Sequence, residues 1–424
     1  MIAELKRRFP FLANSSYAAV SAGSNVLLLV LLVIAGRWLH DEDYGRFQWA
    51  LALTTIVETL MDIGLGPVTI RAVARNREGA DRLFRHVLGL KLAWVVLGLV
   101  VLTIAAPVLR PDPLLVRICY LMGISSAARS YLLTTRGLLQ GLDRFDLEAL
   151  LVLADRLMLL VLGVAALFGG YGLTGLALAF VASRSVMLVG VLGLVRSFLG
   201  PITPIFDRAA WRDLQQAALP LGIWLITLNT YNYVDAVILG VMRSDAEVGW
   251  YSASYRLYEG LTYAPAILSA VLTPRLSALF VNDRSAHRMM MRTALLGSVA
   301  LGIVLGGCAW LLAGWGLPFV FGAEYAPGVA PLQILSAGSV FVFATWILHA
   351  GAISVNLDQR LLYTTLVGLT ANVALNLMLI PRMGIAGAAW ATVIAEAITA
   401  AMLFVQVQHR ISDPAPLVAG GVRR

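Results

Sequence analysis

The segment from Leu39 to Asn76, LHDEDYGRFQWALALTTIVETLMDIGLGPVTIRAVARN, decides how this chain is organised. It recurs in altered form as RSDAEVGWYSASYRLYEGLTYAPAILSAVLTPRLSALF from Arg243 to Phe280. Each copy has an acidic turn that ends in glycine, then a long apolar run, then a basic residue. A repeat of this length indicates two duplicated halves. A shift of 204 positions aligns Asp41 with Asp245, Gly45 with Gly249, and Arg71 with Arg275.

The composition places the chain in a membrane. Hydrophobic residues form 59% of the 424 residues and charged residues only 13%, and the mean hydropathy is +0.81. So little charge cannot cover the surface of a soluble protein of this length, and we therefore expect an integral membrane protein. The two cysteines, Cys119 and Cys308, both lie in apolar runs and predict neither a disulfide framework nor a metal site.

Apolar runs of roughly 20 residues, long enough to cross about 30 Å of hydrocarbon, can be counted along the chain. They predict an all-α membrane protein with twelve transmembrane helices in two pseudo-symmetric six-helix bundles around a central cavity. We place an N-terminal lobe at 1–200, a cytoplasmic linker with an interfacial helix (FDRAAWRDLQQ) at 201–213, and a C-terminal lobe with a short tail at 214–424. The expected spans lie near 13–36, 47–70, 87–109, 114–135, 147–169, 173–195, 214–241, 250–274, 293–320, 329–355, 361–380 and 384–407.

The net charge of +8 could suggest a nucleic-acid partner, but the basic residues fall in short loops between the expected spans. This distribution indicates membrane orientation instead, because positively charged loops stay on the cytoplasmic side. With the N-terminus inside, most of the 32 Lys and Arg residues lie on that side. Both termini are therefore expected to be cytoplasmic.

Ionisable residues within the spans are the first candidates for a functional site, because a charge at mid-membrane costs about 2.5–3.5 kcal/mol. Arg129, Arg184 and Arg256 could attract an anionic group in a wet cavity between the halves, since a guanidinium offers phosphate a planar fork of donors. The alternative is that Glu58 or Asp62 pairs with Arg129 or Arg184 and only holds helices together. We favour the cavity for Arg129 and Arg184, because charges inside a membrane usually face a pathway.

The acidic residues of the spans could bind H⁺ or Na⁺ as a coupling ion; no other cofactor and no metal are expected. Glu58 and Asp62 are four residues apart and share a helix face. Asp155 and Arg156 lie near the expected cytoplasmic end of a span, where long side chains can reach the interface, so no site is expected there. The candidates for ion coupling are Glu58, Asp62, Glu259 and Glu396.

Polar and aromatic residues concentrate in the second half of the chain and could form a wall that contacts a glycan. Tyr255, Tyr258 and Asn232 are the candidates, because tyrosine faces stack on sugar rings and hydroxyl or amide groups bond sugar hydroxyls. The alternative is an aromatic belt at the membrane interface.

The segment LNLMLIPRMGIAGAAWATVIAE, from Leu375 to Glu396, and the opening YGRFQWA of the second expected span carry a resemblance to a known group. With twelve spans in two halves, the chain resembles the polysaccharide flippase branch of the multidrug/oligosaccharidyl-lipid/polysaccharide exporter superfamily. The resemblance implies a transporter of the bacterial inner membrane that moves polyprenyl-diphosphate-linked oligosaccharides outward by alternating access. Its partners would be the lipid-linked oligosaccharide, membrane lipids and other polysaccharide-assembly proteins, and it would act as a monomer.

Two other functions compete with this interpretation. A cation-coupled drug antiporter of the same superfamily would need an acidic, aromatic cavity, which the arginines within the spans disfavour. A membrane glycan polymerase or glycosyltransferase would need a sizeable loop for its chemistry, and the sequence has none between its spans. We therefore expect a transporter and not an enzyme.

Overall fold

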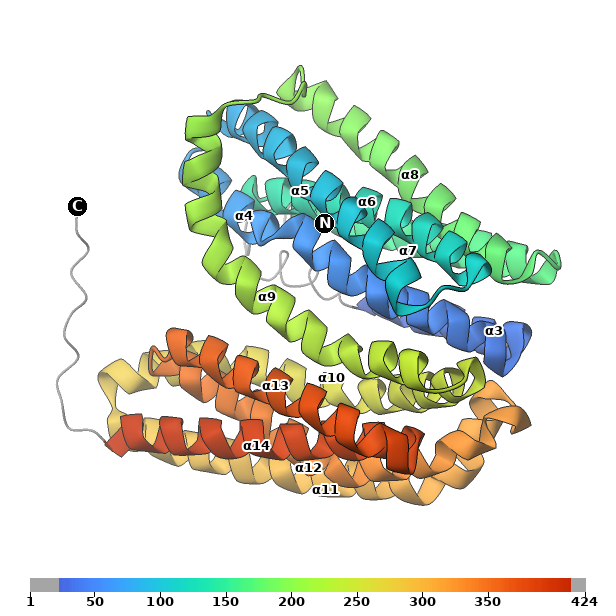
Figure 1. Ribbon diagram of the computed structural model, residues 1–424. Coiled ribbons are helices and arrows are strands. Elements are labelled where there is room, and N and C mark those ends of the chain that lie inside the picture. Colours follow the sequence, from blue (N-terminus) through green and yellow to red (C-terminus); the bar gives the residue numbers. More distant parts are fainter. Residues whose placement is uncertain (1–22, 413–424) are drawn as a thin grey trace, which may run out of the picture. The chain divides into compact units, whose positions relative to one another are not determined.

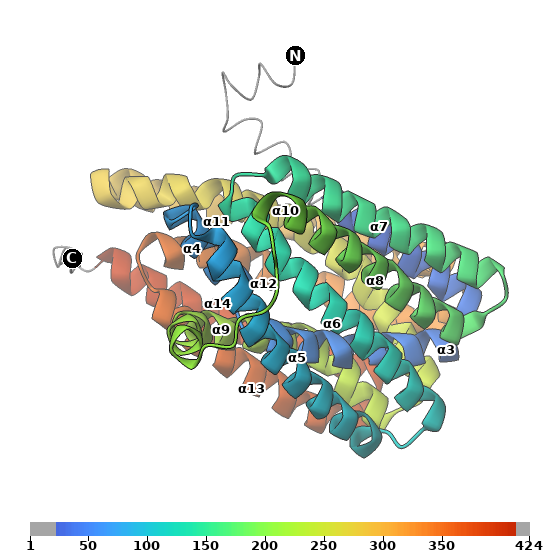
Figure 2. The ribbon, with the colours of Figure 1, turned by 90° about the horizontal axis from the view of Figure 1, so that it is seen from above.

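The computed structural model describes residues 23–412, and every regular element in that range is a helix (Figures 1 and 2). Ten helical segments of this range are long and apolar enough to cross a membrane. The all-α membrane architecture is thus confirmed. The number of twelve spans and the two six-helix bundles stay predictions, and the expected span near 13–36 begins outside the described residues. The helices are α3 (Asn25–Asp62), α4 (Leu65–Arg75), α5 (Ala80–Leu109), α6 (Pro113–Gly141), α7 (Phe145–Phe168), α8 (Gly172–Leu199), α9 (Arg208–Met242), α10 (Asp245–Asn282), α11 (Arg284–Phe321), the 3₁₀ helix η1 (Ala323–Gly328), α12 (Val329–Ser354), α13 (Asp358–Met383) and α14 (Ile385–Ser412).

The helices form two compact units. The N-terminal unit contains the described residues up to Ala253 together with Gly316–Gly328, and the C-terminal unit contains Ser254–Trp315 and the residues from Val329 onward. In the N-terminal unit, α3 packs against α5, α6, α7 and α9. This grouping places α9 with the N-terminal helices, whereas the predicted lobe boundary lies near residue 213. That boundary concerns the duplication and stays a prediction.

α3 contains the first turn of the repeat and reverses direction there. At His40 the backbone leaves the helical region (φ 59°, ψ 175°). Just before it, the ring of Trp38 lies 4.3 Å from that of Phe168 at the C-terminal end of α7. At the far end of α3, Asp62 contacts Thr134 near the opposite end of the α6–α7 hairpin. The two segments of α3 therefore run antiparallel, as the acidic turn in the sequence predicts.

The second expected span, 47–70, is not one continuous helix, and this prediction was wrong. Ile63 and Gly64 adopt the left-handed conformation (φ 43° and 80°) between α3 and α4. The cause is a close approach of α9: a side chain on Gly64 or Gly222 would collide with backbone atoms of the other segment. Because a β-branched residue rarely takes a positive φ, the surrounding packing must hold Ile63 there.

The expected interfacial helix FDRAAWRDLQQ is also not separate. Residues 201–207 are irregular, and the rest of the segment forms the first turns of α9. The Asp207 carboxylate caps this helix by accepting a hydrogen bond of 2.9 Å from the backbone N–H of Ala209. The cap sets the start of α9, and the helix continues from there without a break to Met242.

The two copies of the repeat contact each other through their acidic turns, and the contacts are reciprocal. Nε of Arg46 donates to Asp245 (2.9 Å), while Nε1 of Trp250 donates to Asp41 (3.0 Å). A shift of 204 positions converts one hydrogen bond into the other. The aligned glycines follow the same rule, because a side chain on either one would collide with the backbone carbonyl of the aspartate in the other copy. We call these six residues the turn clasp: Asp41, Gly45, Arg46, Asp245, Gly249 and Trp250.

The helices expose apolar faces, as expected of surfaces in contact with lipid. On α5, Val96, Val100, Ile104 and Val108 are all exposed, with Val108 at 75%. They are spaced by four residues and therefore share one helix face. The opposite face of α5 is buried within the N-terminal unit. A continuous exposed apolar stripe on a helix of this length indicates a membrane environment.

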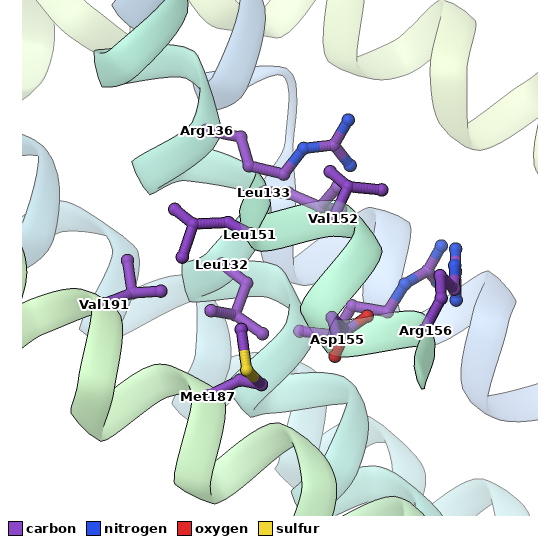
Figure 3. Close-up of a pocket in the computed structure, with 10 residues that line it drawn as sticks. Leu132, Leu133, Arg136, Leu151, Val152, Asp155, Arg156, Met187 and Val191 are labelled. Carbon is purple, nitrogen blue, oxygen red and sulfur yellow. The ribbon is translucent and has the colours of Figure 1, made fainter. Parts of the chain in front are cut away.

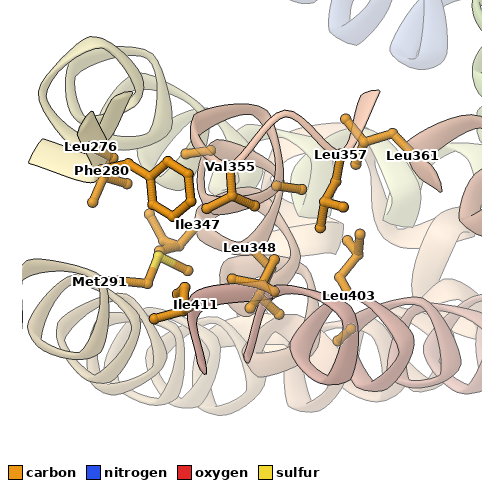
Figure 4. Packing of buried hydrophobic residues seen from close by; sticks show 14 residues of the cluster. Leu276, Phe280, Met291, Ile347, Leu348, Val355, Leu357, Leu361, Leu403 and Ile411 are labelled. Atoms are coloured by element: carbon orange, nitrogen blue, oxygen red, sulfur yellow. The ribbon is translucent and has the colours of Figure 1, made fainter. Parts of the chain in front are cut away.

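The C-terminal unit has its own hydrophobic core, formed by α10 to α14 (Figure 4). Phe280 and Met291 lie at one end of it, beside Ile347 of α12 and Val355, which directly follows α12. Within this unit α14 packs closely against both α12 and α13. The small residues of the quoted segment GIAGAAWAT allow this approach, because a side chain on Gly387 would collide with the backbone of α13 at Leu379.

The turn clasp predicts that Gly45→Ala lowers stability, because the added methyl has no space beside the Asp245 carbonyl. We expect a loss of about 1–3 kcal/mol, seen as a lower midpoint of thermal unfolding for the protein in detergent. Gly193→Ala on α8 is the matched control, since its methyl would enter open space and alanine favours helix. Equal midpoints for the two variants would contradict the close packing of the clasp.

Candidate functional site

A pocket opens within the N-terminal unit between α6, α7 and α8 (Figure 3). Its cavity volume is small, about 30 Å³, within an open region of about 430 Å³ that includes solvent. Apolar residues from all three helices form one part of its wall, including Leu132, Leu151 and Met187. The charged part of the wall consists of Arg129, Arg136, Asp155 and Arg156.

The spacing of these residues along each helix explains why they meet. On α6, Arg129 and Arg136 are seven residues apart and lie on one face, two turns from each other. On α7, Asp155 and Arg156 follow Val152 by three and four residues. α6 itself begins with Pro113 behind the N-cap Asp112, whose carboxylate accepts from the N–H of Leu114. The cap fixes where α6 starts and hence which face presents its arginines.

Arg129 forms an ion pair within this site. Its Nη1 donates to Oε1 of Glu58 on α3 over 2.8 Å. The two partners differ in exposure, since the side chain of Arg129 is 29% exposed and that of Glu58 only 6%. The predicted alternative, an ion pair between Glu58 and Arg129, is therefore present in the structure. Arg129 also lines the pocket.

A second pair lies at the same pocket. Nε and Nη2 of Arg136 both donate to Oε1 of Glu148 on α7, at 2.8 and 2.5 Å. The Glu148 side chain is 2% exposed and that of Arg136 is 30% exposed. As with Arg129, the carboxylate lies behind the arginine and the arginine faces the pocket.

Asp155 and Arg156 were expected to extend to the membrane interface, and this prediction was wrong. Both line the pocket, and Arg156 is only 7% exposed. Arg156 lies within electrostatic range of Asp155, Arg129 and Arg136. Their position near a span end suggested a surface role, because sequence alone does not show that α7 turns this face toward α6 and α8.

Arg184 on α8 lies one turn before the pocket residue Met187 and is almost fully buried, with 3% exposure. Its Nη1 donates to Oγ of Ser125 over 3.3 Å, and the guanidinium lies 5.2 Å from the ring centre of Phe180. Nε is buried without a hydrogen-bond partner. Within the part of the chain that the structure describes, Arg184 forms no ion pair. A buried guanidinium with spare donors has the chemistry to bind an anion, and this role of Arg184 stays a prediction.

Asp62 has a different partner, which the sequence reasoning did not single out. Lys91 on α5 is fully buried, and its Nζ donates to Asp62 over 2.5 Å and to Thr134 over 2.5 Å. The contacts of Lys91 connect α3, α5 and α6 at Asp62, the residue directly before the helix break at Ile63. The signal available in the sequence was a single lysine in the middle of a long apolar run, because a charge at such a position requires a partner.

The other predicted site residues lie elsewhere. Asn232 is exposed on α9 of the N-terminal unit. Five belong to the C-terminal unit. On α10, Arg256 pairs with Glu259 over 2.7 Å, and the rings of Tyr255 and Tyr258 lie 5.8 Å apart. Glu396 on α14 accepts from Thr345 over 3.3 Å. Their roles in anion, glycan or ion binding stay predictions.

Three comparisons with known proteins bear on this fold. Residues 11–280 match the family described as "Polysaccharide biosynthesis protein". A relative named "Probable flippase AglR", from Haloferax volcanii, is 26% identical over 268 residues, which cover 61% of this chain and 54% of AglR. The chain thus spans about half the length of that relative.

Solved structures share the fold across nearly the whole chain. An inward-facing multidrug resistance MATE family transporter of the MOP superfamily superposes with a TM-score of 0.75 at 15% identity, covering 93% of this chain and 98% of the transporter. The lipid II flippase MurJ in an inward closed conformation gives a TM-score of 0.74 at 15% identity, covering 92% and 87%. At such low identity these likenesses establish the fold.

The chain shares the fold of these solved structures, and its apolar helices make it a multi-pass membrane protein. By the family model that matches more than half of its length, it belongs to the polysaccharide biosynthesis protein family. The family membership that the sequence segments suggested is therefore confirmed.

The Asp62–Lys91 contact predicts that removing one of the two charges lowers stability more than removing both. A double variant therefore separates the effect of the unpaired charge from the effect of losing the side chains. Lys91→Met leaves the buried Asp62 carboxylate without its cation and should cost about 3–5 kcal/mol. Lys91→Met combined with Asp62→Asn removes both charges and should recover most of the loss. Thermal unfolding midpoints in detergent measure both. If the double variant unfolds as early as Lys91→Met alone, charge neutralisation is not what this pair contributes.

Proposed function

We propose that this transporter is a flippase for lipid-linked oligosaccharides, which moves polyprenyl-diphosphate-linked glycans from the cytoplasmic to the outer leaflet for polysaccharide biosynthesis. Membership of the polysaccharide biosynthesis protein family and the similarity to AglR support this proposal. We place it in the bacterial inner membrane, as the family resemblance implies, with both termini inside, as the distribution of Lys and Arg in the sequence indicates.

The observation that carries the proposal is the excess of arginine around the pocket in the N-terminal unit. Arg129, Arg136 and Arg156 line it, and the buried Arg184 beside it has no carboxylate partner among the described residues. A diphosphate fits this chemistry, because guanidinium forks bind phosphate oxygens in pairs and stay charged at all physiological pH values. The lipid tail would remain in the bilayer while the charged diphosphate group crosses the membrane through the protein.

The same charge gives the transport a direction. An outward-moving diphosphate with two net negative charges travels from the negative to the positive side of the membrane potential. At 100 mV this releases about 4.6 kcal/mol, at ~2.3 kcal/mol per charge. Flipping could therefore proceed on the membrane potential alone. Coupling to H⁺ or Na⁺ through Glu58, Asp62, Glu259 or Glu396 is the alternative energy source.

Drug antiport is the second candidate, because the MATE family transporter has the same fold. An organic cation would be repelled by the arginine-rich pocket, which makes this candidate weaker. The two functions also differ in cargo charge. Transport assays with an anionic lipid and a cationic dye, such as ethidium, therefore distinguish them directly.

The test is reconstitution of the full chain in liposomes with a fluorescent polyprenyl-diphosphate oligosaccharide. Arg184→Ala and Arg129→Ala should each reduce flipping by about tenfold, because each removes a charge-assisted bond to phosphate. Arg117→Ala is the matched control, since Arg117 lies on α6 but is exposed and outside the pocket. Undiminished flipping by the double variant Arg129→Ala/Arg184→Ala would refute the anion site. Transport of ethidium and not of the lipid would favour the antiporter.

A further inference from the structure

The ion pair between Glu58 and Arg129 is asymmetric with respect to the pocket. Arg129 lines the pocket and its side chain is 29% exposed, whereas the carboxylate of Glu58 is 6% exposed on α3. Glu58 does not line the pocket itself. An anion in the pocket would therefore contact Arg129 and not Glu58. The positive charge of Arg129 would already be partly neutralised by Glu58.

This balance must change how strongly Arg129 attracts an anion. A guanidinium has five N–H donors, and the bond to Glu58 uses Nη1, so donors remain for a phosphate oxygen. The negative charge of Glu58, 2.8 Å from Nη1, nevertheless opposes any second anion at the same group. Arg129 can thus hold phosphate, but less tightly than an unpaired arginine could.

Arg184 provides a comparison beside the pocket, although it does not line the pocket itself. It forms no ion pair among the described residues, and Glu58 and Asp155 act on it only from within electrostatic range. The attraction of the pocket for an anion is therefore reduced at Arg129 but not removed. A transporter needs such a compromise, because a ligand bound too tightly on one side of the membrane is not released on the other.

We infer that Glu58 is a positioning residue that lowers the affinity of the pocket for the phosphate group of its substrate and thereby permits release. This inference rests on the proposed function for the identity of the ligand, a polyprenyl diphosphate. It assigns Glu58 a role different from binding a coupling ion. Glu58 also keeps Arg129 oriented toward the pocket, since their bond fixes the guanidinium.

Further cations surround the buried Glu58 carboxylate and stabilise its charge when Arg129 binds phosphate. Glu58 lies within electrostatic range of Lys91 on α5, Arg156 on α7 and Arg184 on α8, in addition to Arg129 on α6. When Arg129 shares its donors with phosphate, Glu58 is therefore not left as an isolated buried charge. An isolated charge would be too costly for a reversible step.

The test is binding of farnesyl diphosphate, a short polyprenyl diphosphate, to the purified full chain in detergent. Glu58→Gln keeps an oxygen that accepts from Nη1 of Arg129 and removes only the charge. We expect its Kd to fall about tenfold, mostly through a slower dissociation rate. Flipping in liposomes should slow at the same time, because release becomes limiting. Damage to the fold would weaken binding, so tighter binding cannot arise from it.

Two further variants isolate the mechanism. Glu58→Asp retains the charge and should keep the Kd within about threefold of wild type. In an Arg129→Ala background, Glu58→Gln should give clearly less tightening, because Glu58 is bonded directly to Arg129 and acts on the other cations only from a greater distance. An unchanged or raised Kd for Glu58→Gln, or equal tightening without Arg129, would overturn the inference. Failure of the wild-type protein to bind farnesyl diphosphate would instead overturn the proposed function.

Discussion

The N-terminal unit depends on the neutralisation of charges that are buried among apolar helices. α3 supplies two carboxylates on one face, and each meets a cation from a different helix: Glu58 meets Arg129 and Asp62 meets Lys91. An unpaired charge in such surroundings costs several kcal/mol, so these contacts fix how α3 lies against α5 and α6. Arg184 is the exception, because the described residues give it a hydroxyl and an aromatic ring but no carboxylate. The unit thus combines two buried ion pairs with one buried arginine that has no carboxylate bonded to it among the described residues.

A second constraint comes from the duplication. The turn clasp joins the two copies through bonds that a single shift of numbering interconverts, Arg46 to Asp245 and Trp250 to Asp41. Glycine at both aligned positions is required by close backbone approach and not by local conformation, since neither Gly45 nor Gly249 has a positive φ. The glycine and the acidic residue recur in the two copies because each is needed by the other copy. The residue after the glycine differs, yet both arginine and tryptophan supply the N–H donor that the bond needs.

The pocket of the N-terminal unit lies next to the ion pairs that hold its helices together. The pocket lies between α6, α7 and α8, on the side of Arg129 and Arg136 away from their carboxylate partners. In both pairs the acid is buried and the arginine is partly exposed, so the helices are held by pairs whose cations remain accessible. In the function we propose, the same side chains that hold the unit together also attract an anion. Glu58 then adjusts the affinity of Arg129 for that anion.

The sequence by itself determined the membrane class, the reversal near His40 and the family, because hydropathy and repeated motifs are local properties. It did not determine which partner each charge meets: Lys91 was not singled out, and Asp155 and Arg156 were assigned to the interface. Only the tertiary structure decided these contacts, since they join helices distant in sequence. It also decided the break at Ile63 and Gly64, which the apolar pattern of 47–70 conceals and which the close approach of Gly222 on α9 imposes.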